Sequence, residues 1–210
     1  MTGPTHRVYS VLFAFLATLI MYNLDITQIG YYQTLLIVLV FSKSGALFPD
    51  LDHTWQNVKV KNLFNKVINT IIHITGGKHR SWQTHSIDIC ALFTIGAYIV
   101  PKILTSKGIL SEINSEITTL ILLGFASGWI SHLFSDMLTS AGVRLICFLK
   151  FKIKLVPKKI GKLRFNTGNE WEAFNYKMVS LMNNIIGFIC LIYPIITNQE
   201  LINKVVSLLG

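Results

Sequence analysis

Residues 31–53 read YYQTLLIVLVFSKSGALFPDLDH, an apolar run that ends in two carboxylates and an imidazole. A helix needs about 17–25 residues to cross a bilayer, and the run approaches this length. Asp50, Asp52 and His53 follow it directly. Carboxylate oxygens and neutral imidazole nitrogens together suit a divalent metal such as Zn, Mn or Fe. Because ionisable groups are costly near lipid, we interpret this stretch as the opening of a metal site that later segments complete.

The composition indicates a membrane protein. Charged residues make up 14% of the 210 residues, whereas a soluble domain carries about 25%. The mean hydropathy is +0.52. A single helical bundle would use this length, so we expect one domain over residues 1–210. Cys90, Cys147 and Cys190 form no metal or disulfide pattern, and we interpret them as packing residues.

Apolar stretches predict an all-α membrane protein with about five transmembrane helices. The predicted spans are residues 8–24, 31–48, 87–104, 117–138 and 179–197. We interpret the first as an uncleaved span rather than a signal peptide, because no clean cleavage site follows it. Small residues at Gly124, Ser127, Gly128 and Ser131 favour close approach of another helix to the fourth span.

The segments between spans predict two smaller elements. Residues 57–74 have helical apolar spacing with lysines opposite, which is typical of an amphipathic helix. It lies either on the membrane surface or against the bundle. Residues 150–155 alternate as a half-buried strand does, and residues 162–165 can pair with them across residues 157–161. This pattern predicts a small basic β-hairpin.

Lysine and arginine positions predict the orientation. With a cytoplasmic N-terminus, 16 of the 19 basic residues lie in cytoplasmic segments. We therefore expect the N-terminus inside and the C-terminus outside. The net charge of +9 is then mostly a topology signal with some attraction to anionic lipid, and nucleic-acid binding is not needed to explain it.

This orientation places the chemically active residues on the cytoplasmic side, at similar depth. His132 and Asp136 are four positions apart, so they share one helical face and can reach one ion or brace two helices. His79 and His85 flank the start of the third span. Arg80 between them suits a phosphate or carboxylate oxygen, or serves as an ordinary anchor.

Three further residues lie on the same side. His6 precedes the first predicted span, and whether it is a ligand stays open. Glu170 is a further ligand, a general base for water, or simply a carboxylate at a helix N-terminus. We interpret His73 as structural or solvent-facing, because neither a partner nor its spacing supports a role.

Seven candidate ligands exceed the four that one tetrahedral zinc needs. They are Asp50, Asp52, His53, His79, His85, His132 and Asp136. This number permits two ions, or one ion with outer carboxylates that orient the histidines. The sequence shows no Ser–His–Asp elbow, Walker loop or dinucleotide fingerprint.

Together these motifs resemble the YdjM-like family, LexA-regulated inner-membrane proteins regarded as metal-dependent hydrolases. The matching pieces are His6, residues 48–53, His79-Arg80, Thr84-His85-Ser86, residues 128–139 running into Ala141-Gly142, and residues 167–170. The resemblance implies a multi-span helical protein, distantly related in fold to zinc-dependent phospholipases C and nucleases. It also implies that the seven candidate ligands bind metal, and that the protein lies in the bacterial inner membrane.

We therefore expect a membrane-embedded hydrolase at the cytoplasmic face that acts on a phosphoester or lipid-like substrate through metal-activated water. Asp52, Glu170 and Arg80 are the candidate catalytic residues, and one or two ions, zinc before Mn or Fe, are the expected cofactor. Membrane lipids are the expected partners, with no obligate protein partner. The alternative is a metal-binding membrane protein without catalysis, such as a transporter, sensor or regulatory protein.

Overall fold

A computed structural model shows a mostly helical chain with five long apolar helices and a small two-stranded hairpin. It describes residues 3–52, 63–77, 80, 82–144, 146–149, 151–156, 168–197, 203 and 207. The long helices are α1 (Gly3–Asn23), α2 (Tyr31–Gly45), α5 (Ile87–Ser106), α6 (Glu112–Met137) and α7 (Glu170–Thr197). All five are long and apolar enough to cross a membrane, with α2 counted through Leu51. The predicted fold class is therefore confirmed.

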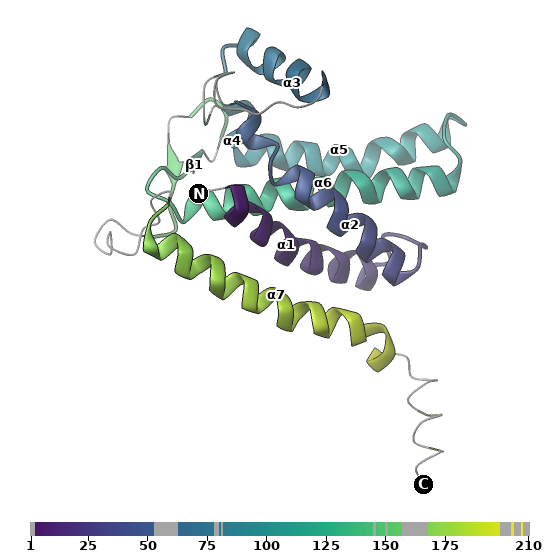
Figure 1. The fold of residues 1–210 in the computed structure, drawn as a ribbon. Helices are drawn as coiled ribbons and strands as arrows, with labels where there is room; N and C mark the ends of the chain where they lie inside the picture. Colours follow the sequence, from purple (N-terminus) through teal and green to yellow (C-terminus); the bar gives the residue numbers. More distant parts are fainter. Residues whose placement is uncertain are drawn as a thin grey trace.

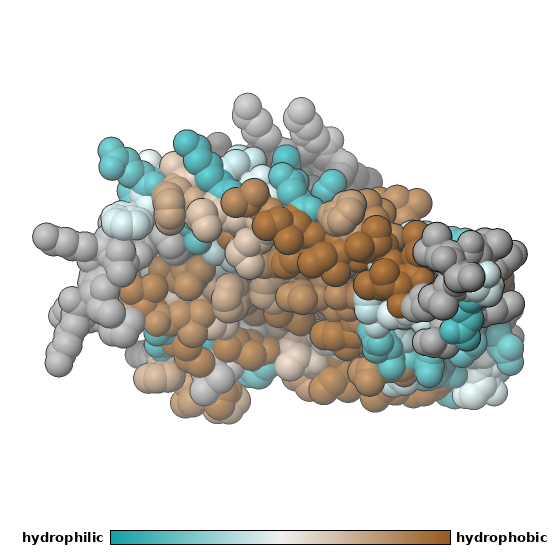
Figure 2. All heavy atoms as spheres, turned by 90° about the horizontal axis from the view of Figure 1, so that it is seen from below, coloured by the Kyte–Doolittle hydropathy of each residue, from teal (hydrophilic) through white to brown (hydrophobic). Residues whose placement is uncertain are grey.

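Helix α6 is the centre of the bundle. It packs against α1, α2 and α5, whereas α7 packs along α1 on the outside (Figure 1). Within the apolar windows of these helices, 56% of α6 residues are buried but only 11% of α7 residues. Figure 2 views the molecule from below, the side on which α7 lies, and hydrophobic side chains dominate this face. Such a surface suits contact with lipid.

Glycines allow α2 and α6 to touch backbone to backbone. A Cβ added to Gly128 would collide with the Ser42 carbonyl oxygen, and one added to Gly45 would collide with the Phe125 carbonyl. A Cβ at Gly124 would lie 3.0 Å from the Val38 Cα. Two of the four small residues predicted to permit a close helix contact, Gly124 and Gly128, are therefore at that contact.

Polar contacts hold the outer helix α7 to the first turns of α1. Thr5 Oγ1 donates to Glu172 Oε1 over 2.8 Å, and Tyr9 OH donates to Asn175 Oδ1 over 2.8 Å. Both helices begin earlier than the apolar patterns predict, at Gly3 and Glu170. The hydropathy of their first turns is low because these turns carry the polar groups that join them. His6 consequently lies within α1 rather than before it.

The short helices connect α2 to α5. The 3₁₀ helix η1 (Pro49–Asp52) follows α2, and α3 (Leu63–Ile74) and α4 (Trp82–His85) come next. The amphipathic helix predicted over residues 57–74 is present from Leu63; residues 57–62 lie outside the described part. Helix α3 packs on η1, where the Asn69 amide donates to the Leu51 carbonyl, and it leaves Ile71 exposed. Its predicted position on the membrane surface stays a prediction.

The described hairpin pairs residues 152–153 with an earlier segment of the chain, and the predicted pairing with residues 162–165 stays a prediction. Strand β2 (Lys152–Ile153) pairs antiparallel with β1 (Val143–Arg144), with Val143 opposite Ile153. Residues 162–165, the predicted partner, lie outside the described residues. Two features favour the observed pairing: Gly142 turns with a φ of +67°, and the Leu155 amide donates to the Met137 carbonyl over 2.9 Å. The hairpin is thereby tied to the end of α6.

The helix contact predicts the effect of adding one methyl group. Gly128→Ala should destabilise the protein by about 1–3 kcal/mol, because overpacking forces the backbones apart. Gly96→Ala on α5 is the matched control, since nothing lies within 4 Å of its added Cβ. Thermal unfolding in detergent would measure both. Equal melting temperatures for the two variants would contradict the proposed role of this contact.

Candidate metal centre

A cluster of histidines and carboxylates forms where the start of α1, η1, α4 and the end of α6 meet. His6, His85, His132 and Asp136 are each at most 2% exposed. Asp50 completes the cluster and is its open member, with 32% of its side chain exposed. Burying so many ionisable groups is expensive unless something compensates for their lost hydration.

The donor atoms converge on Asp136 and His132. Asp136 Oδ2 lies 3.7 Å from His132 Nε2 and 3.6 Å from His85 Nε2, and Asp136 Oδ1 lies 3.9 Å from His6 Nε2. His132 Nε2 lies 3.8 Å from Asp50 Oδ1. These separations exceed hydrogen-bond lengths of about 2.7–3.2 Å. They are nearer to the separation of about 3.3 Å between two ligands that each lie about 2.0–2.1 Å from one tetrahedral ion.

Hydrogen bonds fix which ring nitrogen of His132 carries the proton. Its Nδ1 lies 2.7 Å from the Ala46 carbonyl oxygen, which only accepts. Nδ1 therefore donates, and Nε2 presents its lone pair to the cluster when the imidazole is neutral. Among the described residues no hydrogen-bond partner is present for this buried Nε2.

The same reasoning applies to His6. Its Nδ1 lies 2.7 Å from Ser135 Oγ, and this hydroxyl donates its proton to the His132 carbonyl over 2.9 Å. The serine oxygen therefore accepts from His6 Nδ1, which leaves the lone pair on Nε2. The His6 and His132 rings stack with centroids 3.7 Å apart. Two lone pairs directed toward carboxylate oxygens are unfavourable alone, but they are the arrangement that a divalent cation needs.

Two sets of donors could hold a metal ion. The first is His6, His132 and Asp136, and the second is Asp50, His85 and His132; within each set the donor atoms lie within 4.8 Å of one another. Because His132 belongs to both, the sets are neighbouring parts of one site. Imidazole and carboxylate donors of this kind suit Zn, Mn or Fe.

Arg80 provides a positive charge beside the cluster. Its Nη2 donates to Asp136 Oδ1 over 3.4 Å, and its side chain is 19% exposed. Its backbone has a φ of +59°, in the left-handed region. Such a conformation costs about 1–3 kcal/mol in a non-glycine residue and tends to occur at functional sites.

The structure brings together Asp50, His85, His132 and Asp136 from the residues singled out in the sequence. His53 and His79 lie outside the described residues, as does the side chain of Asp52. Glu170 is exposed at the start of α7. The buried carboxylate there is Glu172, which also accepts from the Gly168 amide over 2.7 Å.

His6 is the member of the cluster that sequence reasoning did not assign. The available signal was its place on the same side of the bilayer as the other histidines. Thr5, its neighbour in α1, is bound to Glu172, so the contact between α1 and α7 also fixes the turn that carries His6.

Comparison with known families shows to which family the chain belongs. The family model described as YdjM inner membrane protein matches residues 1–199. The chain belongs to the YdjM family. This YdjM member is therefore an inner-membrane protein, in agreement with its five candidate spans. Comparisons with curated proteins and with solved structures gave no match.

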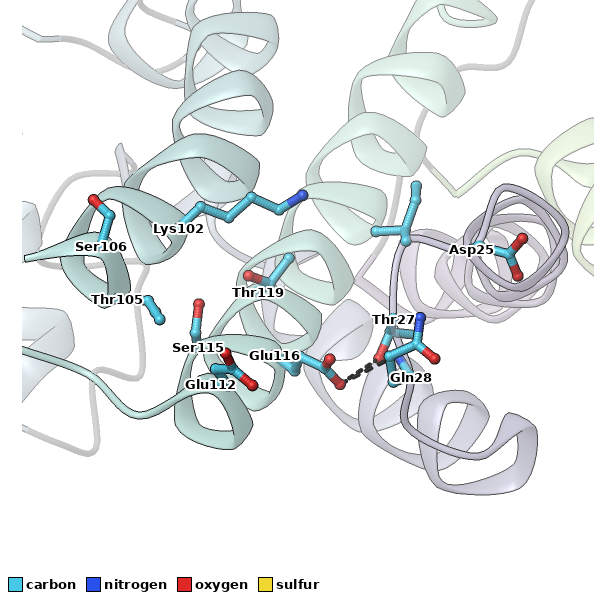
Figure 3. A pocket seen from close by; sticks show the side chains of 11 residues that line it. Asp25, Thr27, Gln28, Lys102, Thr105, Ser106, Glu112, Ser115, Glu116 and Thr119 are labelled. Atoms are coloured by element: carbon cyan, nitrogen blue, oxygen red, sulfur yellow. Dashed lines mark hydrogen bonds between the residues drawn. The ribbon is translucent and has the colours of Figure 1, made fainter. Parts of the chain in front are cut away.

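A second polar pocket of this YdjM protein lies at the other end of α6, where Glu116 is about 30 Å along the helix from Asp136. It has a volume of about 450 Å³ and lies between the loop after α1 and the ends of α5 and α6 (Figure 3). Glu116 Oε2 accepts there from Thr27 Oγ1 and the Gln28 amide, each over 3.2 Å. The described lining has no histidine or cysteine. We interpret Glu116 as a structural residue that fixes the loop after α1 through these two hydrogen bonds.

Metal binding should depend on His6 as well as on His132. His6→Ala should weaken metal affinity by at least the roughly 10–100-fold that follows loss of a supporting contact. His73→Ala is the control, because His73 lies in α3 and its Nδ1 contacts the Gly77 carbonyl. Metal content after dialysis against a chelator, measured by mass spectrometry, would compare the variants. Wild-type retention by His6→Ala would exclude His6 as a ligand.

Proposed function

We propose that this protein is a membrane-embedded, metal-dependent hydrolase that acts on a phosphoester or lipid-like substrate at the cytoplasmic face. The observation that carries the proposal is the buried His6–His132–Asp136 cluster with Arg80 at its edge. A bound divalent cation, zinc before Mn or Fe, would polarise a phosphoryl oxygen and acidify water. Hydrolysis joins the oxygen of water to phosphorus and breaks the ester P–O bond, and the leaving oxygen takes a proton.

The residues of the chain would divide this work between them. His6, His85, His132, Asp50 and Asp136 would hold the cation, with Ser135 and the Ala46 carbonyl keeping two imidazoles in the required tautomer. Arg80 would bind an anionic oxygen of the substrate with its planar fork. Asp52, which ends η1, and Glu170, at the start of α7, remain the proposed proton acceptors.

Two features favour hydrolysis over transport. A transport path needs polar groups across the membrane, but an apolar cluster fills the bundle between its two ends: Ala14, Met21, Val38 and Leu120 are each at most 3% exposed. Nearby hydroxyl groups donate to backbone carbonyls of their own helix; Ser127, for example, donates to the Gly124 carbonyl over 2.7 Å. A polar cluster at one end of an apolar bundle suits a site that takes its substrate from one side of the membrane.

Arg80 offers a test of substrate binding and catalysis. With purified metal-loaded protein, Arg80→Ala should lower kcat/KM on a phosphodiester by about 100–1,000-fold, because it removes one preorganised donor. Arg80→Lys should restore part of the rate, since it returns the charge without the fork. Metal content should be unchanged in both variants, and Lys43→Ala on α2 is the control. Absence of metal-dependent turnover on phosphomonoesters, phosphodiesters and phospholipids would contradict the proposed function.

The proposed orientation has its own test. In a Cys147→Ser background, a membrane-impermeant maleimide applied to intact spheroplasts should label Lys107→Cys, in the loop after α5, but not Phe148→Cys. Both positions are exposed, Phe148 by 79%. Lysis should make Phe148→Cys reactive. The reverse pattern in intact spheroplasts would place the metal centre on the outer face.

A further inference from the structure

We propose that a groove between α2 and α5 holds one acyl chain of a membrane lipid, so that the phosphate-bearing head group of this lipid lies at the metal centre. The inference deepens the proposed function and rests on it, because it names the substrate class of the same site.

The groove is apolar along its whole described lining apart from one hydroxyl. Its volume is about 800 Å³, and α6 forms its floor between Ile121 and Trp129, a length of about 12 Å. The lining includes Phe41, Phe48, Leu92, Phe93, Leu122 and Phe125, and Ser44 supplies the hydroxyl. The volume and the apolar lining suit a flexible hydrocarbon chain.

The position of the groove identifies the occupant. Its two walls and its floor are helices long and apolar enough to span the membrane. Leu92 on its rim is 64% exposed. At this depth the surrounding medium is hydrocarbon, so lipid chains reach the groove directly, while a water-soluble ligand would have to cross apolar lipid first.

One end of the groove adjoins the metal centre. The Phe48 and Trp129 rings lie 4.7 Å apart there. Trp129 Nε1 donates over 2.8 Å to the carbonyl of Thr84, the residue before His85. Asp50, the exposed carboxylate of the cluster, comes two residues after Phe48. A chain that fills the groove therefore directs its polar end toward Asp50.

The charges around the centre suit a phosphate. Arg144 and Lys152 face each other in the hairpin, and Arg80 lies near them. Partial burial, followed by the positive charges of Arg144 and Arg80, lowers the pKa of Lys152. An anion among these side chains would relieve their repulsion and accept charge-assisted hydrogen bonds. Hydrocarbon in the groove and phosphate at its end together describe a phospholipid.

The first experiment measures binding without turnover. Wild-type protein in phosphatidylcholine nanodiscs would be photolabelled with phosphatidic acid that carries a diazirine on one acyl chain. We expect saturable labelling on α5 and α6 at the groove, and a loss of about fivefold or more in Leu122→Trp, which fills the floor. Leu92→Trp on the exposed rim is the second variant, and we expect it to reduce the labelling as well. Ile185→Trp on the lipid-facing side of α7 is the control and should label as wild type does.

The second experiment measures turnover on two substrates with one head group. Wild-type protein should prefer a long-chain phosphatidic acid over its soluble dihexanoyl analogue by about tenfold or more in kcat/KM, since each buried methylene adds to binding. Leu92→Trp should lower this preference by about fivefold or more while its metal content stays at the wild-type value, and Ile185→Trp should keep both the preference and the metal content.

The outcomes separate the two proposals. Hydrolysis without chain-length preference, together with groove labelling that both tryptophan variants leave unchanged, would overturn the acyl-chain site while the hydrolase proposal stands. Saturable groove labelling that Leu122→Trp removes, with no hydrolysis of any phosphoester, would support the acyl-chain site and overturn the hydrolase proposal.

Discussion

The backbone contact between α2 and α6 is the constraint on which the rest of the structure depends. Gly45, Gly124 and Gly128 let the two helices approach until a single methyl group would collide with a carbonyl. The last carbonyl groups of a helix lack partners within it, so the end of α2 can accept a hydrogen bond. The close approach brings His132 Nδ1 within 2.7 Å of the Ala46 carbonyl there. The fold thereby sets the tautomer of the central histidine.

Burial gives this small set of polar groups its chemical character. Water would form hydrogen bonds with an exposed imidazole, but the four most buried members of the cluster have almost no access to water. The Nδ1 atoms of His6 and His132 are bound to Ser135 and to the Ala46 carbonyl, which leaves their Nε2 atoms facing the carboxylate of Asp136. A cation resolves this opposition and is at the same time the group that a hydrolase would use.

Periodicity and composition predicted much of the fold and part of the site. Long apolar runs form helices in a membrane, so the five candidate spans could be predicted from hydropathy. The helical spacing of His132 and Asp136 likewise indicated that they share one face. The first turns of α1 and α7 were missed because their stabilisation comes from pairs such as Thr5 and Glu172, 167 positions apart. His6 was left open for the same reason, since only the packing of α1 on α6 brings it to Ser135. The strand that pairs with residues 152–153 depends on docking to α6, which no local pattern encodes.

The assembly of the cluster from distant helix ends has a consequence for biogenesis. His6 enters the membrane with the first span, but its partner Ser135 follows 129 positions later. A binding site that needs both cannot form before α6 has entered the membrane, because its donors are not yet together. An ion held jointly by His6, His132 and Asp136 could therefore be captured only after α6 has joined the bundle, and a chain truncated before α6 would lack this donor set.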